Sequence, residues 1–80
     1  GEQWKIFPNP TTNQVTLAIA QSETVSQIVV TSASGQKIYS TTTVATNTQL
    51  DLSSFEDGLY FATIIDVHGN QSTKPILLQR

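Results

Sequence analysis

Cysteine is absent from this chain of 80 residues, and histidine occurs once. Without cysteine, neither a disulfide framework nor a thiolate metal site can reinforce the core of so short a chain. A single histidine leaves no second imidazole for a metal ion. We therefore expect one domain that folds on its apolar core alone, with no metal and no other cofactor.

Basic residues are scarce and scattered along the chain. They are Lys5, Lys37, Lys74 and Arg80, and with six acidic residues they give a formal net charge of −2. Nucleic-acid binding depends on clustered cations that displace condensed counterions. The composition therefore argues against a nucleic-acid partner.

Long apolar runs are missing as well. No stretch approaches the roughly 18 apolar residues of a transmembrane helix, and residues 1–4 lack the basic and apolar regions of a signal peptide. The chain is therefore either cytoplasmic or a piece cut from a longer exported precursor. The strand pattern begins almost at once, with Ile6-Phe7, which favours a piece. We expect residues 1–80 to be one domain of such a precursor, without a transmembrane segment.

Alternation of apolar and polar residues recurs in short segments, whereas helical periodicity is missing. The segments are Ile6–Phe7, Gln14–Ala20, Val25–Thr31, Gln36–Ser40, Gln49–Leu52, Leu59–Val67 and Thr73–Gln79. Turn residues such as Ser34-Gly35 and Asp57-Gly58 separate them. The threonine-rich residues 41–46 are expected to form an edge strand or an extended crossing between sheets. The pattern predicts an all-β fold, an immunoglobulin-like antiparallel sandwich of about seven strands.

One face of these segments supplies the expected core. Its members are Ile6, Val15, Leu17, Ile19, Ile28, Val30, Ile38, Leu50, Leu52, Phe55, Tyr60, Ala62, Ile64, Ile76 and Leu78. Tyr60 follows Gly58 at the start of the most apolar segment, the place of a tyrosine corner in sandwiches. We expect its ring in the core and its hydroxyl bonded to the backbone. Trp4 is expected instead to contact whatever precedes the domain.

Residues that could carry chemistry are few. His68 falls in a predicted turn, and no serine stands on a strained elbow beside it, so no catalytic triad is predicted. Asp51, Glu56 and Asp57 lack the alternating spacing of a calcium loop. So short a chain cannot easily frame the deep cleft of a glycoside hydrolase. We predict that the chain is not an enzyme.

Four apolar residues lie on strand faces opposite the predicted core, namely Val29, Phe61, Ile65 and Leu77. Scattered apolar side chains are normal at a protein surface. If these four cluster, however, they form a docking surface for a partner. The edges of a sandwich also invite strand addition, and weak dimerisation through an edge strand is a further hypothesis.

Several features follow one another in a characteristic order. Pro8-Asn9-Pro10 ends the first segment, Gly35 lies in a middle hairpin, Gly58-Leu59-Tyr60 opens the most apolar segment, and Lys74 to Arg80 form the last strand. In this order the chain resembles the type A C-terminal sorting domain of the type IX (Por) secretion system. The resemblance covers nearly the whole chain.

The resemblance assigns a set of sorting-motif positions: Pro8, Asn9, Pro10, Gly35, Gly58, Tyr60, Lys74, Ile76, Leu78 and Arg80. Two residues depart from the family pattern. Asn13 stands where the family often has glycine, although asparagine also tolerates left-handed backbone geometry. Pro75 lies within the last strand, which predicts that this strand is at an edge or bulged.

The resemblance also implies a function. Such a domain lies C-terminal to its cargo, which crosses the inner membrane into the periplasm with a signal peptide. The outer-membrane translocon recognises the folded domain, and a sortase-like protease removes it as the cargo is released or attached to the cell surface. The alternative is an accessory module of a secreted hydrolase that binds polysaccharide or packs on the catalytic domain. A third hypothesis is an adhesin-type repeat.

Overall fold

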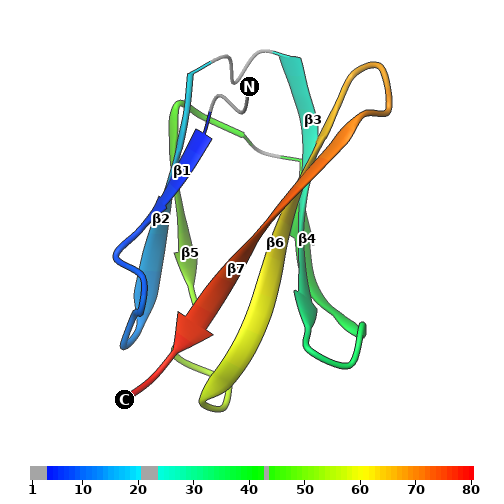
Figure 1. Cartoon of the computed structure of the whole chain (residues 1–80). Coiled ribbons are helices and arrows are strands. Elements are labelled where there is room, and N and C mark those ends of the chain that lie inside the picture. Colours follow the sequence, from blue (N-terminus) through cyan, green and yellow to red (C-terminus); the bar gives the residue numbers. More distant parts are fainter. Residues whose placement is uncertain (1–3, 21–23, 43) are drawn as a thin grey trace.

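Seven β-strands make up the computed structural model, which describes residues 4–20, 24–42 and 44–80. The strands are β1 (Trp4–Phe7), β2 (Gln14–Ile19), β3 (Val25–Ser32), β4 (Lys37–Thr41), β5 (Asn47–Asp51), β6 (Gly58–Asp66) and β7 (Gln71–Leu78). They form two antiparallel sheets with the orders β1-β2-β5 and β4-β3-β6-β7. The sheets face each other as a sandwich (Figure 1). The predicted all-β sandwich is confirmed.

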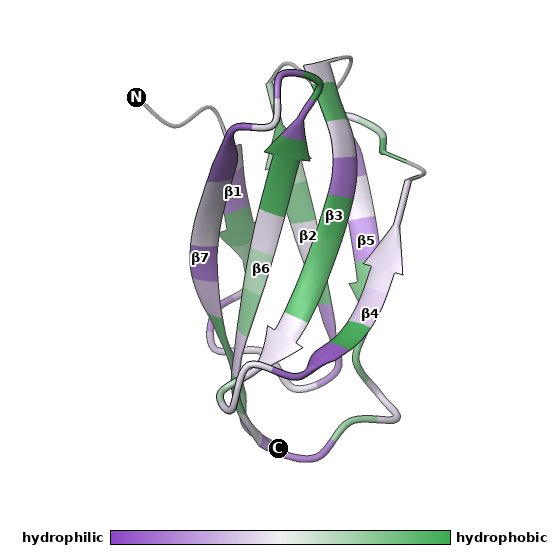
Figure 2. Ribbon diagram, turned by 90° about the vertical axis from the view of Figure 1, so that its right-hand side faces the viewer, coloured by the Kyte–Doolittle hydropathy of each residue, from purple (hydrophilic) through white to green (hydrophobic). Residues whose placement is uncertain are grey.

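The core lies between the two sheets and follows the period-two pattern of the strands. In β2, Val15, Leu17 and Ile19 are buried, while the residues between them are half-buried. Strands β3 and β6, both with apolar side chains along much of their length, take the two central places of the larger sheet (Figure 2). Each large apolar side chain contributes about 1.5–3 kcal/mol when it is fully buried. These side chains therefore hold the sandwich together without any covalent link.

Most of the predicted core is confirmed. Buried side chains are Trp4, Val15, Leu17, Ile19, Ile28, Val30, Leu50, Leu52, Tyr60, Ala62, Ile76 and Leu78. Partly buried residues packed against them are Ile6, Val25, Ile38, Val44, Phe55 and Ile64. The four predicted core residues Ile6, Ile38, Phe55 and Ile64 therefore lie at the margin of the core.

Trp4 belongs to the core, and the expectation that it contacts a preceding segment is wrong. Its side chain is 4% exposed, and its indole Nε1 donates a hydrogen bond to Ser72 Oγ at 3.0 Å. In the ladder between β1 and β2, Trp4 stands opposite Ile19, which is also buried. Trp4 lies two residues before Ile6, so the alternation of β1 already placed both on one face.

The predicted hairpin turn at Gly35 and the predicted crossing between the sheets are both present in the structure. Gly35 lies in the β3–β4 hairpin with a φ of 92°, a left-handed value that glycine adopts without steric cost. Its N–H donates to Ser32 O at 2.9 Å. Thr41 ends β4, and the chain then crosses to β5 in the other sheet. Of the threonine-rich stretch, Thr41 thus belongs to β4, and residues 42 and 44–46 lie in the crossing between the sheets; Thr43 lies outside the described residues.

Candidate recognition site around the last strand

Strand β7 lies at the edge of the four-stranded sheet and pairs there with β6. Pro75 stands opposite Phe61. The pairing of β6 with β7 runs without a register shift from the pair Gly58–Leu78 to the pair Ile65–Gln71. Backbone groups of alternate residues in such a strand point away from the neighbouring strand. Pro75 has no N–H, and at an edge that missing donor costs no ladder bond. Of the two predictions from Pro75, the structure confirms the edge and not the bulge.

Asn9 covers part of this edge with its side-chain amide. Nδ2 donates a hydrogen bond to Pro75 O at 3.0 Å, and Oδ1 accepts one from Leu77 N at 3.0 Å. A side-chain amide carries one hydrogen-bonding edge like that of a peptide group, with both a donor and an acceptor. Asn9 therefore bonds to β7 as a residue of a neighbouring strand would.

Thr11 continues the cover over the end of β7. Its N–H donates to Leu77 O at 2.9 Å, and its carbonyl accepts from Gln79 N at 2.8 Å. The side chain is buried, and Oγ1 donates to Gln14 O at 2.6 Å. Residues 8–11, which we call the edge cover, thus protect the last part of β7. Pro8 and Pro10, both exposed and both following cis peptide bonds, flank Asn9 within it.

Tyr60 confirms the predicted tyrosine corner. The side chain is buried and its hydroxyl donates a hydrogen bond to Glu56 O, four residues earlier. Its ring lies 5.9 Å from that of Phe55, measured between centroids, in a tilted arrangement. The loop before β6 is therefore tied to the core through Tyr60. Gly58 enters that strand with a φ of 153°.

Arg80 also forms hydrogen bonds to this loop. Its Nη1 donates to Phe55 O at 2.8 Å and to Asp57 Oδ1 at 2.9 Å. Its Nη2 donates to Leu52 O at 3.0 Å and to Ser53 O at 3.2 Å. The backbone N–H of Arg80 donates to the second carboxylate oxygen of Asp57 at 3.0 Å. The planar guanidinium therefore joins the end of the last strand to the loop after β5.

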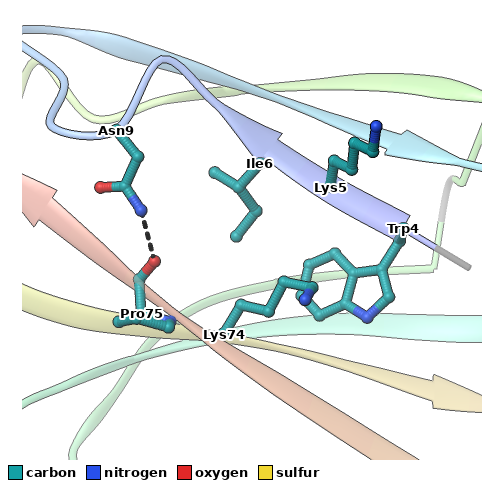
Figure 3. Close-up of a pocket in the computed structure, with 6 residues that line it drawn as sticks. All are labelled: Trp4, Lys5, Ile6, Asn9, Lys74 and Pro75. Atoms are coloured by element: carbon teal, nitrogen blue, oxygen red, sulfur yellow. Dashed lines mark hydrogen bonds between the residues drawn. The ribbon is translucent and has the colours of Figure 1, made fainter. Parts of the chain in front are cut away.

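A groove of about 350 Å³ separates the edges of β1 and β7 (Figure 3). It is lined by Trp4, Lys5, Ile6, Asn9, Lys74 and Pro75. Lys74 Nζ lies 5.4 Å from the centroid of the Trp4 ring, a cation–π distance. Two of the four cations of the chain thus line one groove, and its lining contains no acidic residue.

Most of the sorting-motif positions gather around β7. Ile76 and Leu78 are buried on its inner face, and Tyr60 and Gly58 stand opposite them in β6. Gly35 does not join this group, because it lies in the β3–β4 hairpin, at the other edge of the sheet. Asn13 also needs no left-handed geometry, since no non-glycine residue in the described ranges has a positive φ.

The four predicted docking residues lie on the outer face of the larger sheet, where Val29, opposite Thr63, stands diagonal to both Phe61 and Ile65. Leu77 is exposed, while Val29, Phe61 and Ile65 are half-buried. Phe61 stands opposite Pro75 and thus diagonal to Leu77, so these two are neighbours on the outer face. Ile65 stands opposite Gln71, near the other end of β6.

Leu59 is a surface residue that sequence analysis missed. It is 42% exposed and stands directly opposite Leu77 in the ladder of β6 and β7. With Phe61 and Pro75, these leucines form what we call the outer patch, next to the edge cover. The signal was present in the sequence, because Leu59 and Phe61 are two residues apart and share a face.

Two aspartates, Asp51 and Asp66, accept hydrogen bonds within turns at the surface. Asp66 accepts from the N–H groups of Asn70 and His68, and the Asn70 bond above all lowers the pKa of Asp66. Hydrogen bonds from Ser53 lower the pKa of Asp51.

His68 is exposed in the β6–β7 turn, as predicted. The described part of the chain contains neither three potential metal ligands in a group nor a helix long and apolar enough to cross a membrane.

The family model described as secretion system C-terminal sorting domain matches residues 5–79, nearly the whole chain. A comparison with curated proteins found no match to this chain.

Proposed function

The chain belongs to the secretion system C-terminal sorting domain family, and we propose that it is the signal by which the type IX translocon recognises an exported cargo protein. Its cargo lies N-terminal to it in the same polypeptide. The cargo crosses the periplasm and reaches the cell surface or the medium, and a sortase-like protease removes the domain during export. The domain acts as a ligand in this process and not as a catalyst.

The observation that supports this proposal is the convergence of the sorting-motif positions on one strand. Asn9 and Leu77 lie 68 positions apart in sequence, yet the Asn9 side chain bonds directly to the Leu77 backbone. Arg80 bonds to the loop that Tyr60 holds. These contacts order the last strand at a sheet edge, where a partner can reach it.

The docking surface in this proposal is the outer patch, which contains two of the predicted residues, Phe61 and Leu77. Leu59 and Leu77 are 42% and 39% exposed, and they stand side by side on adjacent strands. Apolar side chains exposed next to each other are favourable to bury against a partner. The patch adjoins the edge cover, so a partner that binds one also meets the other.

Two exposed aromatic side chains on one face would support the alternative of a polysaccharide-binding module. The exposed aromatic residues are Phe7 and Tyr39, at 48% and 42%. They belong to β1 and β4, which lie in different sheets. Trp4 and Tyr60 are buried. The arrangement of aromatic side chains therefore does not favour this alternative.

A reporter experiment in a bacterium with a type IX system tests the proposal. An unrelated protein with a signal peptide carries residues 1–80 at its C-terminus, and we expect it outside the cell. Replacing both Leu59 and Leu77 by Ser should retain the reporter in the periplasm. The matched control is Val67→Ser, in the β6–β7 turn, which removes an apolar side chain that is 59% exposed.

Thermal unfolding of each isolated domain separates lost recognition from lost folding. Deleting residues 76–80 would not serve, because it removes the buried side chains of Ile76 and Leu78. A wild-type reporter that stays in the periplasm would refute the sorting function. Export of the double variant at the wild-type rate would refute the outer patch as the docking surface and leave the sorting function standing.

A further inference from the structure

The outer face of the larger sheet, which faces the viewer in Figure 2, continues beyond the outer patch. Val29 of β3 and Ile65 of β6 point to this face, because Ile28 and Ile64, the residues before them, point into the core or pack against it. Val29 and Ile65 are half-buried, and Val29 is diagonal to both Phe61 and Ile65. The apolar side chains of the outer patch therefore continue through Phe61 across β6 to β3.

No charged side chain interrupts this face. Its outward residues on β3, β6 and β7 are all described by the structure and are apolar, threonine or glutamine: they are alternate residues from Gln27 to Thr31, from Leu59 to Ile65 and from Gln71 to Leu77. The charged residues of the four strands lie elsewhere, since Lys37 begins the edge strand β4, Asp66 ends β6 and Lys74 lines the groove. Charged residues are depleted in the core of protein–protein interfaces. The face therefore has the composition of an interface core.

The polar residues of the face indicate what kind of surface can cover it. Thr63 and Thr73 stand opposite each other on β6 and β7, with their hydroxyls hydrogen-bonded at 2.8 Å, and Gln71 stands opposite Ile65. Hydroxyl and amide groups lose free energy when they are buried without hydrogen-bond partners. The acyl chains of a lipid offer no such partners, whereas a protein surface offers both apolar contact and hydrogen bonds. The mixture of side chains therefore fits a protein.

We infer that the outer face of the larger sheet, from Leu77 on β7 to Val29 on β3, docks as one surface on the translocon, and that the translocon surface covering it is uncharged. A charged group of the partner would be buried against a face that offers it no opposite charge, and such burial is costly. The inference rests on the proposed sorting function. It extends the contact from the outer patch to β3 and states the chemistry of the partner.

Charges of both signs at the centre of the face test this inference. Thr63→Lys and Thr63→Glu each place one charge between β3 and β7, whereas Thr63→Val places none, and all three variants lose the hydrogen bond to Thr73. We expect both charged variants to lower export of the reporter roughly tenfold or more below that of the valine variant. An uncharged partner surface predicts this loss for either sign. An acidic or a basic surface would instead reject one sign and favour the other.

Thr16 provides a matched control on the opposite side of the sandwich. It is also a half-buried threonine, on the outer face of β2, the central strand of the smaller sheet. We expect Thr16→Lys and Thr16→Glu to leave export unchanged. Thermal unfolding of each isolated domain checks that it folds. If a charge at position 63 lowers the unfolding temperature, Thr73→Lys and Thr73→Glu repeat the test at an exposed position of the same face.

Three results of the export assay would overturn the inference. Loss of export with only one sign of charge at position 63 would show that the partner surface is charged. Equal export of the charged Thr63 and Thr16 variants would show that the translocon does not cover the face. Equal export of the charged variants and Thr63→Val would attribute any loss to the missing hydroxyl.

Sedimentation of the isolated domain, alone and with phosphatidylcholine vesicles, tests two other occupants of the face. A dimer that both charged Thr63 variants dissociate would assign the face to a second copy of the chain, and vesicle binding that both variants abolish would assign it to lipid. Either result would overturn the inference. All these results leave the sorting function standing, because the wild-type reporter would still leave the cell. Retention of the wild-type reporter would overturn the proposed function and this inference together.

Discussion

A single amide side chain covers part of the edge of the last strand. Asn9 offers a donor and an acceptor to two backbone groups of β7 that would otherwise meet only solvent. Glutamine, one methylene longer, would carry the amide past these groups, and aspartate would lack the donor for Pro75 O. The proline residues on both sides restrict the backbone of the edge cover, which lowers the entropy lost when Asn9 is placed.

Replacing Asn9 by Ala should destabilise the domain by about 1–2 kcal/mol, because two hydrogen bonds to the backbone are lost at an exposed position. Asn47→Ala on β5 is a matched control at an exposed asparagine, and we expect it to change stability by less than about 0.5 kcal/mol. Urea unfolding of the isolated domain measures both. Equal stability of the two variants would show that the amide contacts of Asn9 contribute nothing measurable.

At the scale of the element, the two strands of the β6–β7 hairpin combine three different environments. Their inner residues are buried in the core, Leu59 and Leu77 pair on the outer face, and the outer edge of β7 is partly covered by Asn9. The turn between the strands is held by Asp66, which accepts hydrogen bonds from His68 N and Asn70 N at 2.8 and 2.9 Å. The carboxylate of Asp66 therefore fixes the point at which β7 begins.

This turn should make the hairpin sensitive to acid. The folded state lowers the pKa of Asp66 below 3.8, chiefly through the Asn70 N–H. The carboxylate therefore contributes stability above the unfolded pKa, and that contribution is lost as the pH falls through the lowered folded pKa. We expect the unfolding temperature to drop below pH 4, and to drop less in Asp66→Asn. Thermal unfolding between pH 2 and 6 measures this, and identical pH profiles would contradict it.

At the scale of the whole molecule, a thin core has to stabilise both sheets. A domain of this length gains only about 0.05–0.15 kcal/mol of net stability per residue. The core contains no disulfide, and its largest fully buried members come from both sheets, such as Leu17 of β2 and Ile76 of β7. Loss of one such side chain therefore consumes a large part of the total stability.

Ile76→Ala should cost about 2–5 kcal/mol, because it leaves a cavity in the core at a fully buried position. Leu77→Ala, one residue along the same strand, removes a side chain that is 39% exposed and should cost markedly less. Chemical denaturation measures both free energies. If the two costs are equal, the inner face of β7 does not carry the stability that its burial indicates.

The local sequence was sufficient to predict the strands and most of the core. Period-two alternation specifies which residues share a face, and the turn residues Gly35 and Gly58 mark where strands end or begin. The same alternation extended by two residues would have placed Trp4 in the core beside Ile6 and Leu59 on the outer face beside Phe61. Both placements therefore follow from the local sequence alone.

Only the tertiary structure decided which distant segments meet. The contact between Asn9 and Leu77 spans 68 positions, and the bonds of Arg80 to Leu52 and Ser53 span 28 and 27. Alternation specifies the face of a side chain but not the neighbour of its strand, because strand order follows from how two sheets close over one core. The edge position of β7, its cover by residues 8–11, and the groove lined by Lys5 and Lys74 all arise at that level.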